Sequence, residues 1–442
     1  MGTHSTPTMQ TKSLLGATAV FLAGCAGSST SVNRTYEPAC CSAEGHAVAT
    51  EHRVAAITDR RFTHAELWKA LEHDLQSDAL TVATVGRSML GRPIRAVSFG
   101  RGPTTVLLWS QMHGNESTAT MALADLIAWF ASDTPAQAAL HERLESKLRI
   151  VMIPMLNPDG SELFQRENAV GIDINRDARS LATPEARTLK ALRDSIKPAF
   201  GFNLHDQNAR TLTGNNGNQV AIALLAPAAD EERSYGPTRA TARQVASVIA
   251  AILRKEIPGR LARYNDSHEP RAFGDLMQQW GTSTVLIESG AMPDDPEKQK
   301  LRTLNVVAIL SALDAMATRS WENADIAAYE GIPTNSRSAV DLLLKGGSLV
   351  LPGLPPTRAD VAINYEESVA KLDARVTDVG DLVRVIALDT VDVSGLFLHP
   401  SPAMLTTRDG GSWIRFDTTA VISVRRGPAP GSEEVRVIGP AR

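Results

Sequence analysis

The sequence predicts an α/β protein with a mostly parallel, mixed sheet covered by helices on both faces, followed by a small β-rich domain. Between residues 52 and 325, apolar runs typical of buried strands alternate with amphipathic stretches, which favours parallel strands joined by helices. After about residue 330 the segments become short and β-like, and Pro- and Gly-rich turns separate them. Because 442 residues are too many for one ordinary domain, we expect a large domain at 52–325 and a small one at 330–442.

Five apolar runs are the candidate strands of the large domain. They are Val106–Ser110, Leu148–Pro154, Ala199–Leu204, Val220–Leu225 and Thr282–Ile287. Short, continuous apolar runs of this kind are consistent with strands that are buried on both faces. They therefore predict a sheet that lies between two layers of helices.

Helical patterns lie between these runs. The segment Ser117–Ser132 carries apolar residues at helical spacing, namely Leu123, Leu126, Ile127 and Phe130. A second helix is expected to open at Thr183, whose hydroxyl can cap it and which is followed by Pro184 at the first helical position. A third, of about 20 residues, is expected to begin near Pro296.

The composition indicates a globular chain. Hydrophobic residues make up 43% of it and charged residues 21%. The 45 Lys and Arg residues against 49 Asp and Glu give a net charge of −4, and no long basic run occurs, so nothing favours a nucleic-acid partner. No apolar stretch reaches the roughly 18 residues of a membrane-spanning helix. Three cysteines cannot build a disulfide scaffold.

The N-terminal segment has the layout of a secretory signal. A lysine precedes the apolar run Ser13–Gly24, which ends in small residues before Cys25. The tetrapeptide Leu22-Ala23-Gly24-Cys25 resembles the lipobox of bacterial lipoproteins, which implies cleavage before Cys25 and lipidation of its thiol. We therefore expect a signal peptide at 1–24 and a lipid-anchored protein of the bacterial cell envelope, facing the periplasm or the exterior. The alternative is a buried apolar helix that ends in a cysteine.

Residues 25–51 are expected to form a tether between the lipid anchor and the large domain. Cys40 and Cys41 are adjacent within it. A disulfide between neighbouring cysteines would be strained, so the sequence assigns these two residues no role.

Candidate metal ligands follow two of the apolar runs. His113 and Glu116 lie just after Val106–Ser110, at the carboxyl end of a predicted strand, which is the edge where open α/β sheets bind ligands. His205 directly follows Ala199–Leu204. Two His and one Glu, with water in the fourth place, make up a catalytic type of zinc site. The alternative for His205 is a strand-end histidine satisfied by hydrogen bonds alone.

Two further groups suit hydrolysis at such a site. Glu288 follows the run Thr282–Ile287, and a carboxylate that faces a metal-bound water can act as general base. One loop carries Arg166, Asn175 and Arg176, which suit a substrate carboxylate and a developing oxyanion. The alternatives are an ordinary strand-end glutamate in solvent and two solvated arginines.

The order of these motifs resembles that of the zinc carboxypeptidases, the funnelin or carboxypeptidase A family. The motifs are His113-x-x-Glu116, Asn157-Pro158-Asp159-Gly160, Asp173-Ile174-Asn175-Arg176, His205 and Glu288, and they span roughly residues 80–320. The resemblance implies a zinc carboxypeptidase-like fold. It also implies that a single Zn²⁺ per chain is bound by His113, Glu116 and His205, with Glu288 as general base.

The resemblance implies roles for the loop residues as well. Arg166 matches the arginine that polarises the scissile carbonyl, and Asn175 and Arg176 match the pair that holds the terminal carboxylate of the substrate. Asp173 matches the carboxylate that orients the first zinc-binding histidine, a role with its own physical logic.

The sequence also departs from the family pattern. Asp206 and Gln207 follow His205 where digestive members have a small residue and later an aromatic-Pro stretch, and Asp177 adds a negative charge next to Arg176. The candidates for the family's mobile tyrosine are Tyr264 and Tyr235. These departures leave the zinc chemistry in place and bear on the substrate.

Together these features predict a zinc-dependent metallocarboxypeptidase, a hydrolase that cuts C-terminal peptide bonds through a metal-activated water. Its expected partners are a peptide with a free C-terminus and, through the lipid anchor, a membrane. One alternative keeps the zinc in an amidase or deacylase acting on small N-acyl amino acids or cell-wall peptides. The other is a non-catalytic peptide-binding lipoprotein, although the complete set of ligands, base and arginines argues against it.

Overall fold

The structure is a computed structural model that describes residues 42–214, 217–336, 338–368 and 371–439. The predicted signal peptide, the lipidated Cys25 and the pair Cys40 and Cys41 lie outside these residues. The lipoprotein interpretation therefore stays a prediction.

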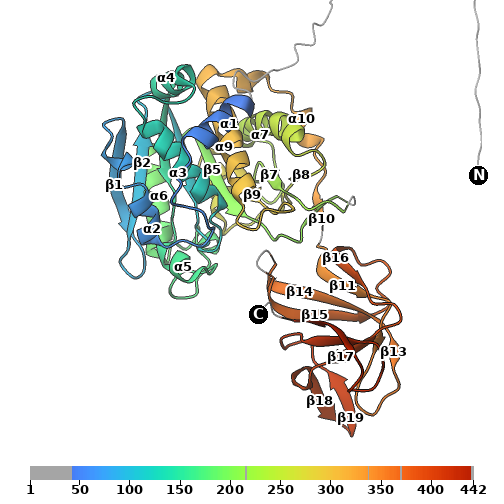
Figure 1. The fold of residues 1–442 in the computed structure, drawn as a ribbon. Helices are drawn as coiled ribbons and strands as arrows, with labels where there is room; N and C mark the ends of the chain where they lie inside the picture. Colours follow the sequence, from blue (N-terminus) through green and yellow to red (C-terminus); the bar gives the residue numbers. More distant parts are fainter. Residues whose placement is uncertain (1–41, 215–216, 337, 369–370, 440–442) are drawn as a thin grey trace, which may run out of the picture. The chain divides into compact units, whose positions relative to one another are not determined.

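An eight-stranded mixed sheet organises the segment that carries the candidate site (Figure 1). Its strand order is β1-β2-β4-β3-β5-β9-β7-β8, where the strands are β1 (Leu80–Arg87), β2 (Pro93–Phe99), β3 (Thr104–Ser110), β4 (Leu148–Ile153), β5 (Phe200–Asp206), β7 (Ile222–Leu225), β8 (Leu261–Arg263) and β9 (Ser283–Ser289). The pairs β4–β3, β3–β5, β5–β9 and β7–β8 are parallel and the other three are antiparallel. The predicted mostly parallel, mixed sheet is confirmed.

Both faces of this sheet are buried. In β3, Val106 and Leu108 pack into one core while Leu107 and Trp109 pack into the other, as the period of two along a strand requires. Because each face needs apolar side chains, the strand appears in the sequence as an unbroken apolar run.

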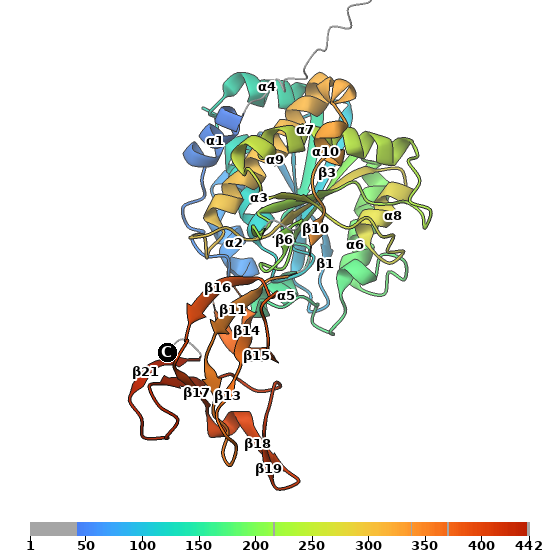
Figure 2. The same cartoon turned by 90° about the vertical axis from the view of Figure 1, so that its right-hand side faces the viewer.

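Helices supply the two outer layers (Figure 2). The core on one face takes side chains from α1 (Ser42–Glu51), α2 (His64–Ala70), α3 (Thr118–Ala131), α4 (Ala138–Lys147), α7 (Pro237–Glu256) and α9 (Gln299–Thr318). The core on the other face takes them from α6 (Pro184–Ile196) and α8 (Phe273–Gln279). Two short helices, α5 (Pro158–Leu163) and α10 (Ala327–Glu330), complete this segment.

The predicted elements lie close to those observed. The five apolar runs correspond to β3, β4, β5, β7 and β9, and α6 begins at Pro184 with the Thr183 hydroxyl accepting a hydrogen bond from the Ala186 N–H. Strand β1 was not among the predicted strands because its side chains are mostly exposed and form no apolar run. Its identity as a strand depends on pairing with β2.

The tether prediction for residues 25–51 is wrong for residues 42–51, which form α1. Val48 and Ala49 of this helix are fully buried in the same core as α9. Gly45 lies so close to Val307 that an added Cβ would be 2.9 Å from its Cα. The helix carries few apolar residues and packs through small ones, so its sequence shows no clear apolar stripe.

The C-terminal segment is β-rich, as predicted. A four-stranded sheet has the order β15-β14-β11-β16, a five-stranded sheet has the order β13-β12-β17-β20-β21, and β18 and β19 form a separate pair. The strands are β11 (Val340–Lys345), β12 (Ser348–Leu349), β13 (Thr357–Arg358), β14 (Asp360–Glu367), β15 (Leu372–Gly380), β16 (Ala387–Asp392), β17 (Phe397–Pro400), β18 (Leu405–Arg408), β19 (Gly411–Ile414), β20 (Ile422–Arg425) and β21 (Glu434–Ile438). Just before them, β10 (Asn335–Ser336) pairs with β6 (Leu212–Thr213).

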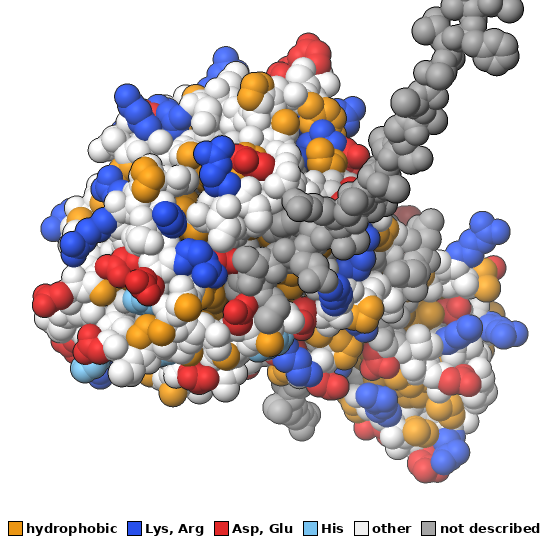
Figure 3. Space-filling view, turned by 90° about the horizontal axis from the view of Figure 1, so that it is seen from above, with side chains coloured by type: hydrophobic (Ala, Val, Ile, Leu, Met, Phe, Trp, Pro, Cys, Tyr) orange, Lys and Arg blue, Asp and Glu red, His pale blue; other side chains and the backbone are white. Residues whose placement is uncertain are grey.

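Within the described residues, α9 is the one helix whose length and hydropathy would suffice to cross a membrane. Its apolar window is 83% buried inside the protein, so core packing accounts for its composition. On the face drawn in Figure 3, basic and acidic side chains are interspersed among uncharged ones, in keeping with the small net charge.

A buried ion pair ties α9 to α3. Arg302 and Asp125 are both fully buried, and the Arg302 Nε lies 2.7 Å from Asp125 Oδ2. The Arg302 guanidinium also donates to the carbonyls of Ile57 at 2.6 Å and Val54 at 3.2 Å, so it holds the segment after α1 as well.

We predict that Arg302→Met lowers the free energy of unfolding by about 3–5 kcal/mol, because it leaves the Asp125 carboxylate buried without its partner. The double variant that also carries Asp125→Asn should recover part of this loss. Denaturant titration followed by circular dichroism measures both, with Arg375→Met, which removes an exposed pair with Glu366, as control. A loss below about 1 kcal/mol for Arg302→Met would contradict the prediction.

Candidate metal centre and substrate pocket

Three neighbouring parallel strands place the candidate site at one edge of the sheet. Strand β5 lies between β3 and β9 and is parallel to both, so the carboxyl ends of all three strands meet there. His113 lies on the loop after β3. His205 on β5 and Glu288 on β9 are directly paired in register, which sets their side chains next to each other.

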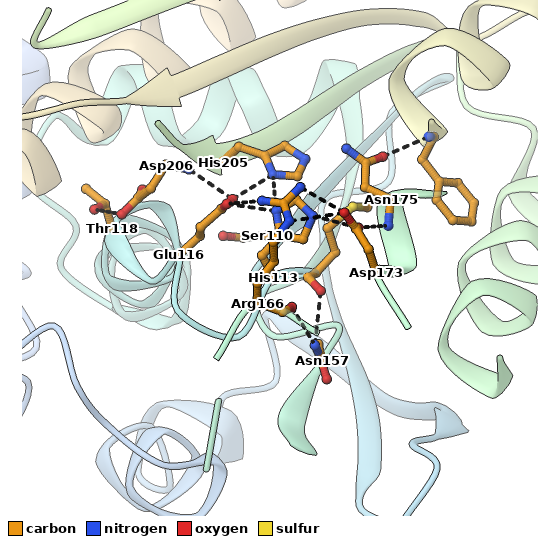
Figure 4. Close-up of polar contacts among 12 residues, drawn as sticks. Ser110, His113, Glu116, Thr118, Asn157, Arg166, Asp173, Asn175, His205 and Asp206 are labelled. Atoms are coloured by element: carbon orange, nitrogen blue, oxygen red, sulfur yellow. Dashed lines mark hydrogen bonds and ion pairs between the residues drawn. The ribbon is translucent and has the colours of Figure 1, made fainter. Parts of the chain in front are cut away.

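The three predicted ligands converge (Figure 4). One ligand atom from each of His113, Glu116 and His205 lies within 4.8 Å of the others, and all three residues are buried. The His113 Nδ1 is 2.8 Å from Glu116 Oε1, and the His205 Nδ1 is 2.7 Å from Glu116 Oε2. The two Nδ1 atoms are 3.2 Å apart.

This donor set fits a zinc ion. Two imidazole nitrogens that face each other beside a carboxylate present lone pairs to one point, and two His with one Glu is a catalytic zinc set. Despite its burial, contacts with His113 and His205 hold the pKa of Glu116 well below its ordinary value, so the carboxylate is ionised. No other group of three or more His, Cys, Asp or Glu side chains in the described ranges has this geometry.

Asp173 holds the first histidine. Its Oδ1 lies 3.0 Å from the His113 Nε2, so the Nε2–H donates a hydrogen bond to the carboxylate and Nδ1 faces the ligand cluster. In the absence of a metal ion, burial of the ring opposes a charge, but Glu116 and Asp173 outweigh it and raise the pKa of His113 to about 9, so zinc would take the place of the Nδ1 proton. Asp173 also accepts a hydrogen bond from the Asn175 N–H at 2.8 Å, which shapes the loop.

Arg166 reaches the same cluster from the loop. Its Nη2 lies 2.9 Å from Asp173 Oδ2 and its Nη1 lies 3.1 Å from Glu116 Oε1. The Arg166 side chain is 39% exposed and lines the pocket next to the ligands. It is therefore placed to meet negative charge that develops beside the metal.

The motif Asn157-Pro158-Asp159-Gly160 supports the loop after β3. The Asn157 side chain caps α5 by accepting from the Gly160 N–H at 2.9 Å, and its Nδ2 donates to the Met112 carbonyl at 3.2 Å. Gly114 lies against Gly160, where an added Cβ would be 2.0 Å from the Gly160 carbonyl carbon. The motif thus fixes the backbone around His113 rather than lining the pocket.

Asn175 and Arg176 line a cavity of about 400 Å³ beside the ligands, together with Arg166, Tyr264 and Glu288. The Asn175 Oδ1 accepts a hydrogen bond at 2.9 Å from the N–H of Phe273, the first residue of α8. The amide nitrogen of Asn175 is therefore left to face the pocket. Both residues therefore lie at the same cavity as the candidate ligands, and their role in binding a carboxylate stays a prediction.

The negative charge beside Arg176 comes from a residue that the sequence did not single out. Asp177 is buried and its carboxylate accepts from the backbone N–H groups of Ala182 and Thr183, so it points toward the start of α6. Instead, Glu269 Oε2 lies 3.3 Å from the Arg176 Nε. Nothing local in the sequence marks Glu269, because it reaches Arg176 only through the packing of the loop before α8.

Glu288 is buried at the inner wall of the pocket. Burial, followed by the neighbouring Glu116 carboxylate, raises its pKa well above the ordinary value. Tyr264 lines the same cavity, whereas Tyr235 is exposed and lies under Arg239 and Arg243. Of the two tyrosine candidates, only Tyr264 is therefore near the site.

A buried ion pair between Asp206 and Lys298, which the sequence did not predict, lies next to the candidate ligands. Asp206 Oδ2 accepts from the Lys298 Nζ at 2.8 Å and from the Thr118 hydroxyl at 2.7 Å, and both charged side chains are almost fully buried. The Asp206 N–H donates to Glu116 Oε2 at 3.1 Å. The pair therefore fixes the end of β5 next to the metal ligands.

Residues 66–222 match the family model described as zinc carboxypeptidase. The probable carboxypeptidase 2 of Arthroderma benhamiae is 32% identical over 104 residues, which are 23% of this chain and 19% of that protein. The carboxypeptidase N catalytic chain of Rattus norvegicus is 28% identical over 151 residues, 29% of this chain and 33% of that one. The chain thus spans a third or less of the length of these curated relatives.

A solved metallo-carboxypeptidase from Burkholderia cenocepacia is 17% identical, with a TM-score of 0.46 over 57% of this chain and 70% of that one. The range matched by the family model contains His113, Glu116, Arg166, Asp173 and His205, while Glu288 lies beyond it. Residues 66–222, which carry the candidate metal ligands, are thus similar to the zinc carboxypeptidase family.

Proposed function

We propose that the protein is a zinc-dependent metallocarboxypeptidase that removes the last residue from peptides with a free C-terminus. The observation that carries the proposal is the convergence of His113, Glu116 and His205 at a pocket that also holds a buried carboxylate and two arginines. A zinc ion bound there would polarise the scissile carbonyl and lower the pKa of a water molecule.

The substrate's end would be held by Arg176 and Asn175. Arg176 can form two parallel hydrogen bonds with a carboxylate, and the Asn175 amide nitrogen can donate a further one. Glu269 Oε2 lies 3.3 Å from the Arg176 Nε, and the Arg176 Nη1 donates to the Asn175 carbonyl at 2.9 Å, so these two contacts orient the guanidinium.

The chemical step would use Arg166 and Glu288. Arg166 donates hydrogen bonds to the carbonyl oxygen as negative charge develops on it, which stabilises the transition state rather than the bound substrate. Glu288 accepts a proton from the attacking water and delivers it to the leaving amine. A buried carboxylate with a raised pKa has the proton affinity that this transfer needs.

We predict that the purified protein binds zinc stoichiometrically and that His205→Ala loses it, because two ligands hold the ion far more weakly than three. Elemental analysis after dialysis measures the zinc content. His399→Ala, which removes a β17 imidazole whose Nε2 lies 3.1 Å from the Gly427 carbonyl, is the matched control. Stoichiometric zinc in His205→Ala would exclude the proposed ligand set.

We predict that Glu288→Gln keeps both zinc and fold but loses about 100- to 10,000-fold in kcat, because the nearly isosteric amide cannot take a proton. Peptide hydrolysis is measured at matched zinc content, with the exposed Glu142→Gln as control. Activity within a few-fold of the unmodified protein would mean that another group is the base.

We predict that replacing Arg176 and replacing Arg166 change different kinetic constants. Arg176→Ala should mainly raise KM, and amidating the substrate's C-terminus should have the same effect. Arg166→Ala should mainly lower kcat, by roughly 100- to 1,000-fold, since it removes a donor to the oxyanion. Steady-state kinetics on one peptide in its free-acid and amidated forms separates the two roles. Equal hydrolysis rates on both forms would show that Arg176 does not bind the terminal carboxylate of the substrate.

A further inference from the structure

Lys298 is a buried cation that the proposed mechanism does not use. It directly precedes α9, and its side chain is only 4% exposed. Lysine is almost never buried to this degree unless its charge is paired, because the ammonium group loses its hydration in the protein interior. Its Nζ lies 2.8 Å from Asp206 Oδ2. The contact with Asp206 therefore accounts for the buried ammonium.

The backbone of Lys298 has an uncommon conformation. Its φ is 53°, in the left-handed region that side chains with a Cβ rarely adopt. Such a conformation costs free energy and persists where the surrounding structure requires it. The Asp295 carboxylate holds the turn by accepting from the N–H groups of Lys300 and Leu301 at 3.1 Å. The turn before α9 thus fixes the point from which the Lys298 side chain extends.

Asp206 links this lysine to the metal ligands. It follows His205 on β5, so side-chain alternation along the strand turns its carboxylate away from the ligand cluster, toward Thr118 and Lys298 at the starts of α3 and α9. Its Oδ2 accepts from the Thr118 hydroxyl at 2.7 Å as well. Its backbone N–H donates to Glu116 Oε2 at 3.1 Å (Figure 4). Lys298 and Thr118 therefore hold the side chain of the residue whose backbone contacts the ligand.

The Glu116 carboxylate is the ligand that this arrangement orients. Its oxygens contact the Nδ1 atoms of His113 and His205, and also Arg166 and the Asp206 N–H. A zinc ion bound there would engage both imidazole nitrogens. Arg166 and the Asp206 N–H would then be the contacts that remain to orient the carboxylate. The position of the Asp206 backbone therefore bears directly on how Glu116 meets the ion.

We propose that Lys298 is a positioning residue for the metal site, which acts by holding Asp206 and thereby keeps the Glu116 carboxylate in the orientation that binds zinc. The inference rests on the proposed function, since it takes the ion at this site to be zinc. Lys298 lies outside residues 66–222, so the match to the family model does not assign it this role. Replacing residues that orient metal ligands typically weakens metal affinity by about 10- to 100-fold.

The test measures the zinc dissociation constant of the full chain by competition with a chromophoric chelator. Lys298→Met should weaken zinc binding about 10- to 100-fold, because it leaves the Asp206 carboxylate buried without its partner and loosens the end of β5. On Coulombic grounds alone, removing a positive charge near the site would strengthen the binding of a dication. The sign of the change therefore separates a positioning role from a simple effect of charge. Unchanged or tighter zinc binding would overturn the inference.

Arg302→Met is the matched control. Arg302 is a buried cation four residues further along the same helix, but it pairs with Asp125 rather than with a residue next to the ligands. The control therefore removes a buried ion pair as well, and it should leave zinc affinity unchanged at a temperature where circular dichroism shows both variants to be folded. Equal weakening in both variants would show that lost stability, and not the position of the ligand, is the cause.

Two further variants keep the test decisive if Lys298→Met does not fold. Combining it with Asp206→Asn removes both charges and keeps the backbone N–H that contacts Glu116, so zinc affinity should largely return. A double variant that folds and binds zinc as weakly as Lys298→Met, or at least tenfold more weakly than the unmodified protein, would exclude action through Asp206. Thr118→Val removes a hydrogen bond to the same Asp206 oxygen without leaving a charge unpaired, and it should weaken zinc binding too.

The outcomes distinguish this inference from the proposed function. If the unmodified protein binds zinc and both Lys298→Met and Thr118→Val bind it equally well, the inference is overturned while the proposed ligand set stands. Unmodified protein that binds no zinc would overturn both.

Discussion

The parallel pairing of β3, β5 and β9 is the constraint on which the rest of the site depends. Parallel strands bring their carboxyl ends to one edge, so residues that are about 90 positions apart in the chain, such as His113 and His205, meet there. The in-register pairing of His205 with Glu288 then fixes the proposed base beside the ligands. Both faces of this sheet are packed, which keeps the edge rigid.

Charge balance around the ligands is a second constraint. Burial disfavours ionised side chains, yet Glu116, Asp173 and Arg166 lie together because each offsets another's charge. The same holds for Asp206 and Lys298, whose ion pair supports the end of β5. Such a network orders the ligands before a metal binds, which is the arrangement that a preorganised hydrolytic site requires.

The two sides of the pocket differ in kind. On one side Arg176 carries charge and Glu269 orients it, which suits the charged end of a peptide. On the other side Asn115 and Gln207 are neutral amides with unpaired atoms.

The sequence by itself determined the five strands with continuous apolar runs, because burial on both faces leaves a strong local pattern. It also marked His113, Glu116, His205 and Glu288, since each follows such a run. Only the tertiary structure decided the packing of α1, the contact of Glu269 with Arg176 and the contact of the buried Asp177 with the start of α6. These depend on neighbours that are distant in the chain, and short-range patterns carry no information about them. The unpaired amide of Gln207 belongs to the same class, because a missing partner is visible only once every neighbouring group is in place.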